Sequence, residues 1–201
     1  SDAGSAEVQA FLTRWAGSYQ EDRLRNDWLL LLGQRRDWAQ FAEQHPSYRM
    51  SDDKEVRCYA LLIDTLKGTA PATAADEVRR NWYAQRDNDD GCTHAAGELY
   101  GYKKLTAQDV WRKARLAVEA NRVRAARSAV EIVSPESSAQ VKELMDSATK
   151  YLHSRATARG KARQELVTLA LIKLAQGDVD NAATQLDSKW GVHLSPEELM
   201  T

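Results

Sequence analysis

Apolar residues recur through this chain at spacings of three and four, the period of an α-helix that buries one face. Two such stripes lie near the start, Val8-Phe11-Leu12-Trp15 and Leu24-Trp28-Leu31-Leu32. No segment alternates between apolar and polar residues for long enough to indicate a strand. Ten Gly and four Pro in 201 residues are few, against about 12% in an average chain, which favours long helices. The sequence therefore predicts an all-α fold.

Glycines and capping residues predict where the helices begin and end. We expect Gly17, Gly33 and Gly68 to end helices, because glycine readily adopts the left-handed conformation found there. We expect Ser51-Asp52-Asp53 to begin the helix that carries Cys58. Later helices are expected over roughly 73–86, 92–101, 106–119, 122–132, 136–152, 157–176 and 179–187.

These helices form pairs joined by short turns, and one pairing recurs. Residues 175–183 resemble residues 118–126, and residues 32–38 form a looser third copy. The copies are unevenly spaced, which predicts an irregular α-superhelix over residues 1–201 rather than a regular repeat array. Ser195-Pro196-Glu197-Glu198 is typical of a helix start, although the chain stops at Thr201. We therefore expect these residues to be part of a longer protein.

Charge and hydropathy exclude several classes of protein. The formal net charge is −1, which does not favour binding to nucleic acid. No apolar run is long enough to predict a transmembrane segment. The N-terminus does not resemble a signal peptide, so the chain is either cytosolic or a mature exported protein. Cys58 and Cys92 lie 34 positions apart without a CxxC motif, and both a free-thiol pair and a disulfide are compatible with that spacing.

Motifs for catalysis are missing from the sequence. There is no HExxH, no glycine-rich phosphate loop and no GxSxG, and the four histidines lie far apart. Cys92-Thr93-His94 is interpreted as a group of turn residues rather than half of a metal site. We therefore predict no catalytic residue, metal or cofactor in this chain.

Basic and aromatic residues indicate a possible contact surface. Cations cluster in 111–127 and in 150–163, and either group could follow a polymer or form an ordinary solvated helix face. Trp15, Trp28 and Trp38 lie on apolar stripes and are predicted to be core. Aromatic rings beside polar residues could stack on sugars. The residues proposed for contact with a glycan or a partner are Trp82, Trp111, Arg112, Lys113 and Arg115.

Several segments resemble the helical N-terminal region of soluble lytic transglycosylases, periplasmic enzymes that cleave the glycan strands of peptidoglycan. They are Leu24-Arg25-Asn26-Asp27-Trp28-Leu29, Arg36-Asp37-Trp38, Arg57-Cys58-Tyr59, Asp90-Gly91-Cys92 and the segment from Val110 to Ala117. The resemblance extends from about Leu24 to Leu174. It implies a superhelical domain, a Cys58–Cys92 disulfide, and a periplasmic protein whose signal peptide has been removed.

The resemblance also implies what this chain does not do. The family's catalytic Glu lies in a separate lysozyme-like domain, within a Glu-Ser dipeptide followed by Gly-Leu-Met-Gln. Glu136-Ser137 matches the dipeptide, but no such segment follows it, so Glu136 is assigned no role. The intact enzyme would cleave MurNAc–GlcNAc bonds to 1,6-anhydro products, with a carboxylic acid acting first as acid and then as base. This chain would position glycan strands or other cell-wall proteins; the alternative is a cytosolic helical-repeat adaptor.

Overall fold

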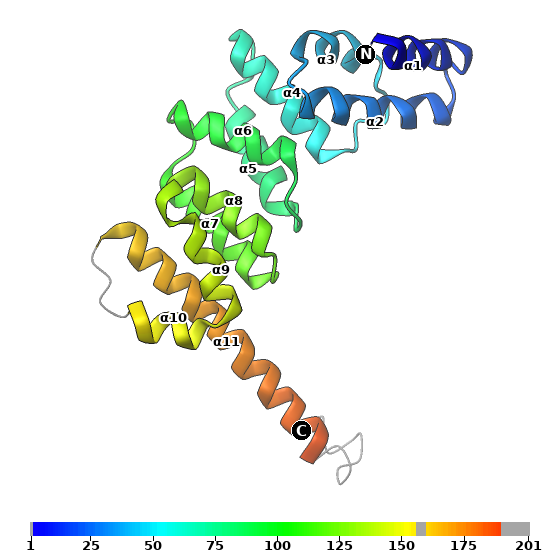
Figure 1. Ribbon diagram of the computed structural model, residues 1–201. Coiled ribbons are helices and arrows are strands. Elements are labelled where there is room, and N and C mark those ends of the chain that lie inside the picture. Colours follow the sequence, from blue (N-terminus) through cyan, green and yellow to red (C-terminus); the bar gives the residue numbers. More distant parts are fainter. Residues whose placement is uncertain (1, 156–159, 190–201) are drawn as a thin grey trace. The chain divides into compact units, whose positions relative to one another are not determined.

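The computed structural model describes residues 2–155 and 160–189, and every regular element within them is helical, as the sequence predicts (Figure 1). The α-helices are α1 (Asp2–Arg14), α2 (Tyr19–Gln34), α3 (Trp38–Gln44), α4 (Lys54–Lys67), α5 (Ala74–Ala84), α6 (Asp90–Gly101), α7 (Ala107–Glu119), α8 (Val123–Val133), α9 (Ser138–Asp146), α10 (Ala148–Arg155) and α11 (Lys161–Lys189). Two short 3₁₀ turns accompany them, η1 (His45–Ser47) and η2 (Pro135–Ser137). The expected helix at Ser195 lies outside the described residues.

The chain forms two compact units, residues 1–110 and 111–201, and the boundary falls within α7. In the first unit α4 packs against α2, α5 and α6. Its apolar core consists of Leu12, Trp28, Leu29, Leu32, Phe41, Tyr48, Val56, Tyr59, Ala60 and Ile63. Trp28 is buried as predicted, and Trp38 packs against this core. Trp15 is 45% exposed, so its assignment to the core is wrong.

In the second unit α9 packs against α8, α10 and α11. Small side chains form much of its interior: Ala125, Ala126 and Ala129 of α8 are all buried. A helix face of alanines permits close approach of a neighbouring helix, because it has no long side chain to separate the two backbones. Leu144, Leu166 and other larger residues complete this core.

Two of the three predicted glycine stops are confirmed. Gly17 and Gly68 adopt left-handed φ values of 84° and 73° after α1 and α4. Gly33 instead lies inside α2, and the left-handed residue that ends this helix is Arg36, with φ of 59°. An added Cβ on Gly33 would lie 2.4 Å from Cε2 of Tyr59. The glycine therefore allows the tyrosine ring to lie directly on the α2 backbone.

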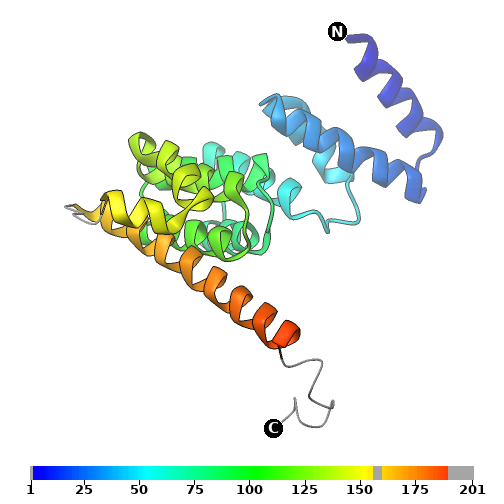
Figure 2. The ribbon, with the colours of Figure 1, turned by 60° about the horizontal axis from the view of Figure 1, so that its bottom comes forward.

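Two helix boundaries in the second unit differ from those predicted. The helix expected over 136–152 is interrupted at Ser147, whose backbone is extended and whose Oγ accepts a hydrogen bond from Lys150 N. A serine N-cap therefore starts a new helix without glycine or proline. In contrast, the break expected between the helices at 157–176 and 179–187 is wrong, and α11 continues through Gly177 as one rod (Figure 2). The copy at 118–126 contains a turn, with left-handed Asn121, so the two copies differ in structure.

Candidate functional site: a disulfide junction and two polar clefts

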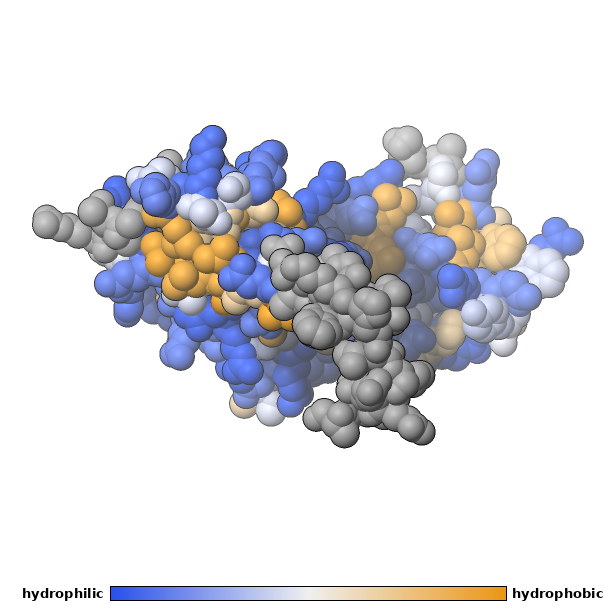
Figure 3. All heavy atoms as spheres, turned by 90° about the horizontal axis from the view of Figure 1, so that it is seen from below, coloured by the Kyte–Doolittle hydropathy of each residue, from blue (hydrophilic) through white to orange (hydrophobic). Residues whose placement is uncertain are grey.

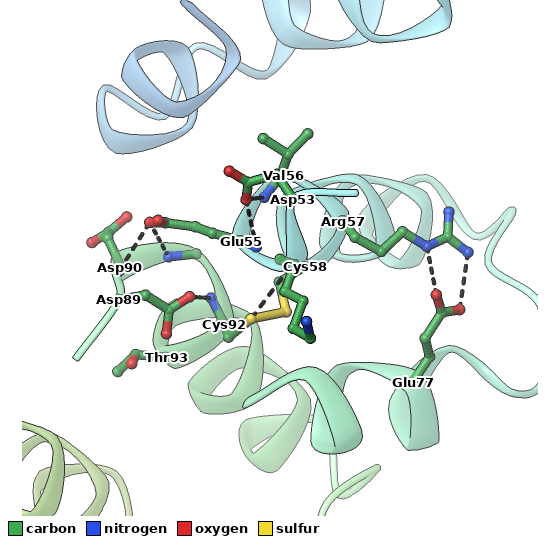
Figure 4. The surroundings of a disulfide bond; sticks show 12 residues. Asp53, Glu55, Val56, Arg57, Cys58, Glu77, Asp89, Asp90, Cys92 and Thr93 are labelled. Carbon is green, nitrogen blue, oxygen red and sulfur yellow. Dashed lines mark hydrogen bonds and ion pairs between the residues drawn. A yellow bond between two sulfur atoms is a disulfide. The ribbon is translucent and has the colours of Figure 1, made fainter. Parts of the chain in front are cut away.

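Cys58 and Cys92 form a disulfide in the first unit, where α4 and α6 pack together. Cys58 lies in the second turn of α4 and Cys92 in the first turn of α6, with Cα atoms 4.9 Å apart. Both side chains are fully buried, and Figure 4 shows the bridge linking the two helices. The disulfide implied by the family resemblance is therefore confirmed.

Carboxylates hold the first turn of α6 against the bridge. Asp89 is the N-cap and accepts a hydrogen bond from Cys92 N at 3.0 Å. Glu55 reaches across from α4 and accepts from the backbone N–H groups of Asp90 and Gly91, at 3.1 and 3.0 Å (Figure 4). Burial raises the pKa of Glu55. An added Cβ on Gly91 would lie 2.6 Å from Glu55 Cγ, so the close approach of the two helices requires glycine here.

The turn after α2 reaches the same junction. Arg36 forms a two-pronged ion pair with Asp90, and the hydroxyl of Tyr59 donates to the same carboxylate. Although burial raises the pKa of Asp90, these two hydrogen bonds bring it below its ordinary value. The ring of Trp38 stacks on His94 with centroids 6.1 Å apart. Three of the segments that carry the family resemblance therefore meet at one place.

Neither metal binding nor acid catalysis fits the geometry of the two motifs considered for them. Cys92 is held in the disulfide, so its sulfur does not join His94 as a ligand. Within residues 2–155 and 160–189, no group of three or more His, Cys, Asp or Glu could hold a metal ion. Glu136 is exposed, and its hydrogen bond from Ser134 Oγ lowers its pKa. A general acid needs a raised pKa, so this environment does not suit that role.

Residues 48–53, which connect η1 to α4, lie between two polar clefts of the first unit. Both clefts are lined by Tyr48, Asp52 and Asp53. The first, here the His45 cleft, has a volume of about 390 Å³ and extends along His45, Lys54, Arg57, Glu77 and Asn81. The second, here the Tyr19 cleft, has a volume of about 320 Å³ and extends along Tyr19, Arg23, Asn26, Asp27 and Met50. Binding pockets for small ligands range from about 300 to 1,000 Å³.

Hydrogen bonds around Tyr48 join the two clefts. Its hydroxyl donates to Asn26 Oδ1 at 2.7 Å and lies 3.0 Å from Asp52 Oδ1. Asn26 Nδ2 in turn donates to Asp53 Oδ2 at 3.2 Å. Burial, together with the bond to Asp52, raises the pKa of Tyr48 to about 12. Tyr48 therefore keeps its proton at neutral pH, and its hydroxyl contacts Asp52 directly and Asp53 through Asn26.

The far end of the His45 cleft is set by an ion pair between α4 and α5. The guanidinium of Arg57 donates to both carboxylate oxygens of Glu77, at 2.6 and 2.9 Å (Figure 4). This hydrogen bonding lowers the pKa of Glu77, so the carboxylate is charged at neutral pH. Burial, followed by the charge of Arg57, lowers the pKa of His45, which keeps the imidazole neutral.

The aromatic contacts proposed from the sequence do not fit the structure. Trp82 and Trp111 are only 1% and 5% exposed, and Lys113 is 3% exposed, so neither ring offers a face to a sugar. Trp82 belongs to the buried stripe of α5 together with Ala74 and Val78. That four-residue spacing is visible in the sequence, whereas the polar neighbours that suggested exposure point in other directions around the helix.

The basic cluster proposed beside Trp111 is not a continuous exposed stripe. Arg112 is exposed, but Arg115 is half-buried and forms an ion pair with Glu165 of α11 at 2.5 Å. Lys113 lies between them in sequence and is buried. The cations therefore have different surroundings, although they are neighbours in the sequence.

The surface is hydrophilic, with apolar side chains gathered in several separate patches in the view of Figure 3. Exposed large apolar residues include Trp15 and Tyr19 in the first unit and Leu171 and Val179 in the second. In the described part of the chain, no helix has the length and apolar character needed to cross a membrane.

Comparison with solved structures shows a similarity that bears on function. No family model matches the chain, and no curated protein matches it. Among solved structures it is similar to lytic transglycosylase Slt from Pseudomonas aeruginosa, solved as an inactive mutant, with a TM-score of 0.52 and 25% sequence identity. The match covers 96% of this chain and 32% of that one. The chain therefore shares the helical fold of about a third of a lytic transglycosylase.

The disulfide and this similarity fit an extracytoplasmic location. Disulfides persist in oxidising compartments and are rare in the cytosol, where thiols are kept reduced. The sequence alone left free thiols and a bridge as alternatives, and the bridge between α4 and α6 now favours export.

Proposed function

We propose that this chain is the non-catalytic superhelical part of a periplasmic lytic transglycosylase, and that it positions peptidoglycan strands or partner proteins for a catalytic domain outside these 201 residues. The observation that carries the proposal is the similarity to lytic transglycosylase Slt, which extends over 96% of this chain. The buried disulfide agrees with an exported protein whose signal peptide has been removed.

The residues of this chain support a positioning role rather than catalysis. Glycosidic bond cleavage requires a carboxylic acid that keeps its proton until the reaction. Hydrogen bonding instead lowers the pKa of Glu136, the residue of the Glu-Ser dipeptide, which the sequence analysis assigned no role. In the first unit burial raises the pKa of Glu55, but its carboxylate accepts hydrogen bonds from the backbone at the start of α6. The chemistry would therefore belong to another part of the full protein.

A sedimentation assay with purified sacculi tests the proposal. The oxidised chain should pellet with intact peptidoglycan at low salt, and heat-unfolded protein serves as the control for non-specific adhesion. The same incubation should release no 1,6-anhydro muropeptides, as measured by mass spectrometry. A chain that stays in the supernatant would contradict the positioning of peptidoglycan strands, and release of anhydro products would contradict its non-catalytic character.

Alkylation in denaturant without reductant separates this proposal from the cytosolic adaptor. Protein made in an oxidising compartment should take up no alkyl groups, because both thiols are used in the bridge. Two adducts per chain, together with a lack of sacculus binding, would favour the adaptor.

A further inference from the structure

The segment at residues 48–53 is a rigid wall between the His45 and Tyr19 clefts. Asp22 of α2, only 2% exposed, accepts hydrogen bonds from the backbone N–H groups of Arg49 and Met50 at 2.8 and 2.9 Å. One turn further along α2, Asn26 binds both ends of the segment through Tyr48 and Asp53. A ligand bound here would therefore meet groups that are already held in place, which reduces the entropic cost of binding.

Several polar side chains of these clefts have hydrogen-bonding capacity that the described residues do not use. The side chains of Arg23 and Asp27, one turn apart on α2, are exposed and make no hydrogen bond or ion pair with another described residue. The ammonium of Lys54 and the amide of Asn81 also have no side-chain partner within residues 2–155 and 160–189. Donors and acceptors are therefore available along both clefts.

The charge of the lining selects a class of ligand. Four carboxylates (Asp27, Asp52, Asp53 and Glu77) face three cations (Arg23, Lys54 and Arg57). This near balance attracts neither a polyanion nor a polycation strongly. Alternating donors and acceptors suit a neutral ligand whose groups both donate and accept, as hydroxyl and amide groups do. A saccharide has this character throughout its length.

Tyr19 adds an apolar face to the Tyr19 cleft. It begins α2, lines the cleft and is 63% exposed. An aromatic ring can pack its face on the C–H groups of a sugar while its hydroxyl remains in water. In this respect Tyr19 has the exposure that Trp82 and Trp111 lack.

We infer that the two clefts on either side of residues 48–53 bind an oligosaccharide, with Tyr19 stacking on one sugar ring and Arg23 and Asp27 bonding its hydroxyl groups. The inference rests on the proposed function, since a glycan strand of peptidoglycan would be the natural ligand. It goes further by assigning the contact to the first unit and to residues that the sequence patterns did not indicate.

An NMR titration with chitotetraose, a soluble β-1,4-linked tetramer of N-acetylglucosamine, tests this inference. Amide signals of residues 19–27 and 48–53 should shift on binding in the ¹⁵N-labelled chain. Tyr19→Ala should weaken binding about tenfold, as loss of one aromatic stacking contact does. Tyr102→Ala removes a ring that is 52% exposed in the same unit but outside the clefts, and should bind as the unchanged chain does.

A double variant, Arg23→Gln with Asp27→Asn, keeps size and net charge while removing both charges, and should also lose affinity. The four substituted residues, Tyr19, Arg23, Asp27 and Tyr102, are exposed, so unchanged melting temperatures will show that the variants fold. Equal affinity of all variants for chitotetraose and sacculi would overturn the saccharide site but leave the proposed function standing. Binding of a lysine-rich peptide in place of chitotetraose would also overturn the site and indicate a peptide partner. No binding of the unchanged chain to either chitotetraose or sacculi would refute both the saccharide site and the positioning of peptidoglycan strands.

Discussion

Removing the Cys58–Cys92 bridge should lower the stability of the first unit by an amount that follows from its position in the chain. The bridge joins residues 34 positions apart. In the chain-entropy description, reopening a loop of that size restores conformational freedom to the unfolded state worth about 3.8 kcal/mol at 25 °C. The bridged sulfurs are fully buried, so their packing contributes separately from the covalent constraint.

This free energy corresponds to a large shift in melting temperature. With an unfolding entropy of about 2.1 cal/mol/K per residue, the 110 residues of the first unit give a decrease of about 16 °C. The reduced chain is prepared by unfolding in denaturant, reduction with a phosphine and refolding in its presence. This chain keeps both sulfur atoms, so it differs from the oxidised chain only in the covalent bond. Calorimetry of the oxidised and reduced chains measures the shift.

The double variant Cys58→Ala with Cys92→Ala supplies the control. Its melting temperature should be insensitive to reductant and should lie at or below that of the reduced chain, because it also loses buried volume. A difference of less than about 4 °C between oxidised and reduced chains, roughly 1 kcal/mol at this size, would refute the reasoning. It would mean that the unfolded chain already holds α4 and α6 close together.

Two further perturbations test the packing of α2. Gly33→Ala should lower the free energy of unfolding by about 1–3 kcal/mol, because the new Cβ would overlap the ring of Tyr59. Gly101→Ala, whose added Cβ has nothing within 4 Å, should leave that free energy unchanged. Urea unfolding measures both. The hydrogen bond from Arg25, opposed by burial, lowers the pKa of Glu21, so the stability from this pair is present above pH 4.5 and is lost as pH falls below it. Thermal melts from pH 7 to pH 3 should show that loss, and Glu21→Gln, which removes the carboxylate paired with the buried guanidinium of Arg25, should lower the free energy of unfolding by about 3–5 kcal/mol at pH 7.

Much of the fold follows from the sequence, because helical periodicity reports which face is buried. What periodicity does not report is why a glycine is present. At Gly68 the glycine ends α4 in a left-handed conformation, whereas at Gly33 it makes room for a ring from another helix. The second role depends on Tyr59, which is 26 positions away in the sequence, so no local pattern could separate the two. The break at Ser147 was missed for a related reason, since serine is a common residue inside helices as well as at their starts.

The candidate site was harder to predict, because its residues are brought together by contacts between elements. The disulfide came from a family resemblance and not from cysteine spacing. The clefts depend on Asp22 and Asn26 binding a segment more than 20 residues away, and nothing in the sequence of residues 48–53 indicates this. For Trp82 the information was present, since its four-residue spacing from Val78 predicts burial. The polar residues adjacent to Trp82 in the chain gave the wrong interpretation.

The disulfide and the clefts are linked through the first turns of α4. Asp53 lines both clefts and is also the N-cap of α4, accepting from Glu55 N and Val56 N. Glu55 in turn binds the start of α6 beside the bridge. Because Cys58 lies about one turn beyond Asp53, the covalent bond opposes fraying of the helix end that positions the cleft wall. The bridge should therefore stabilise the cleft wall as well as the fold. Outside the cytoplasm, where disulfides persist, both effects would be retained.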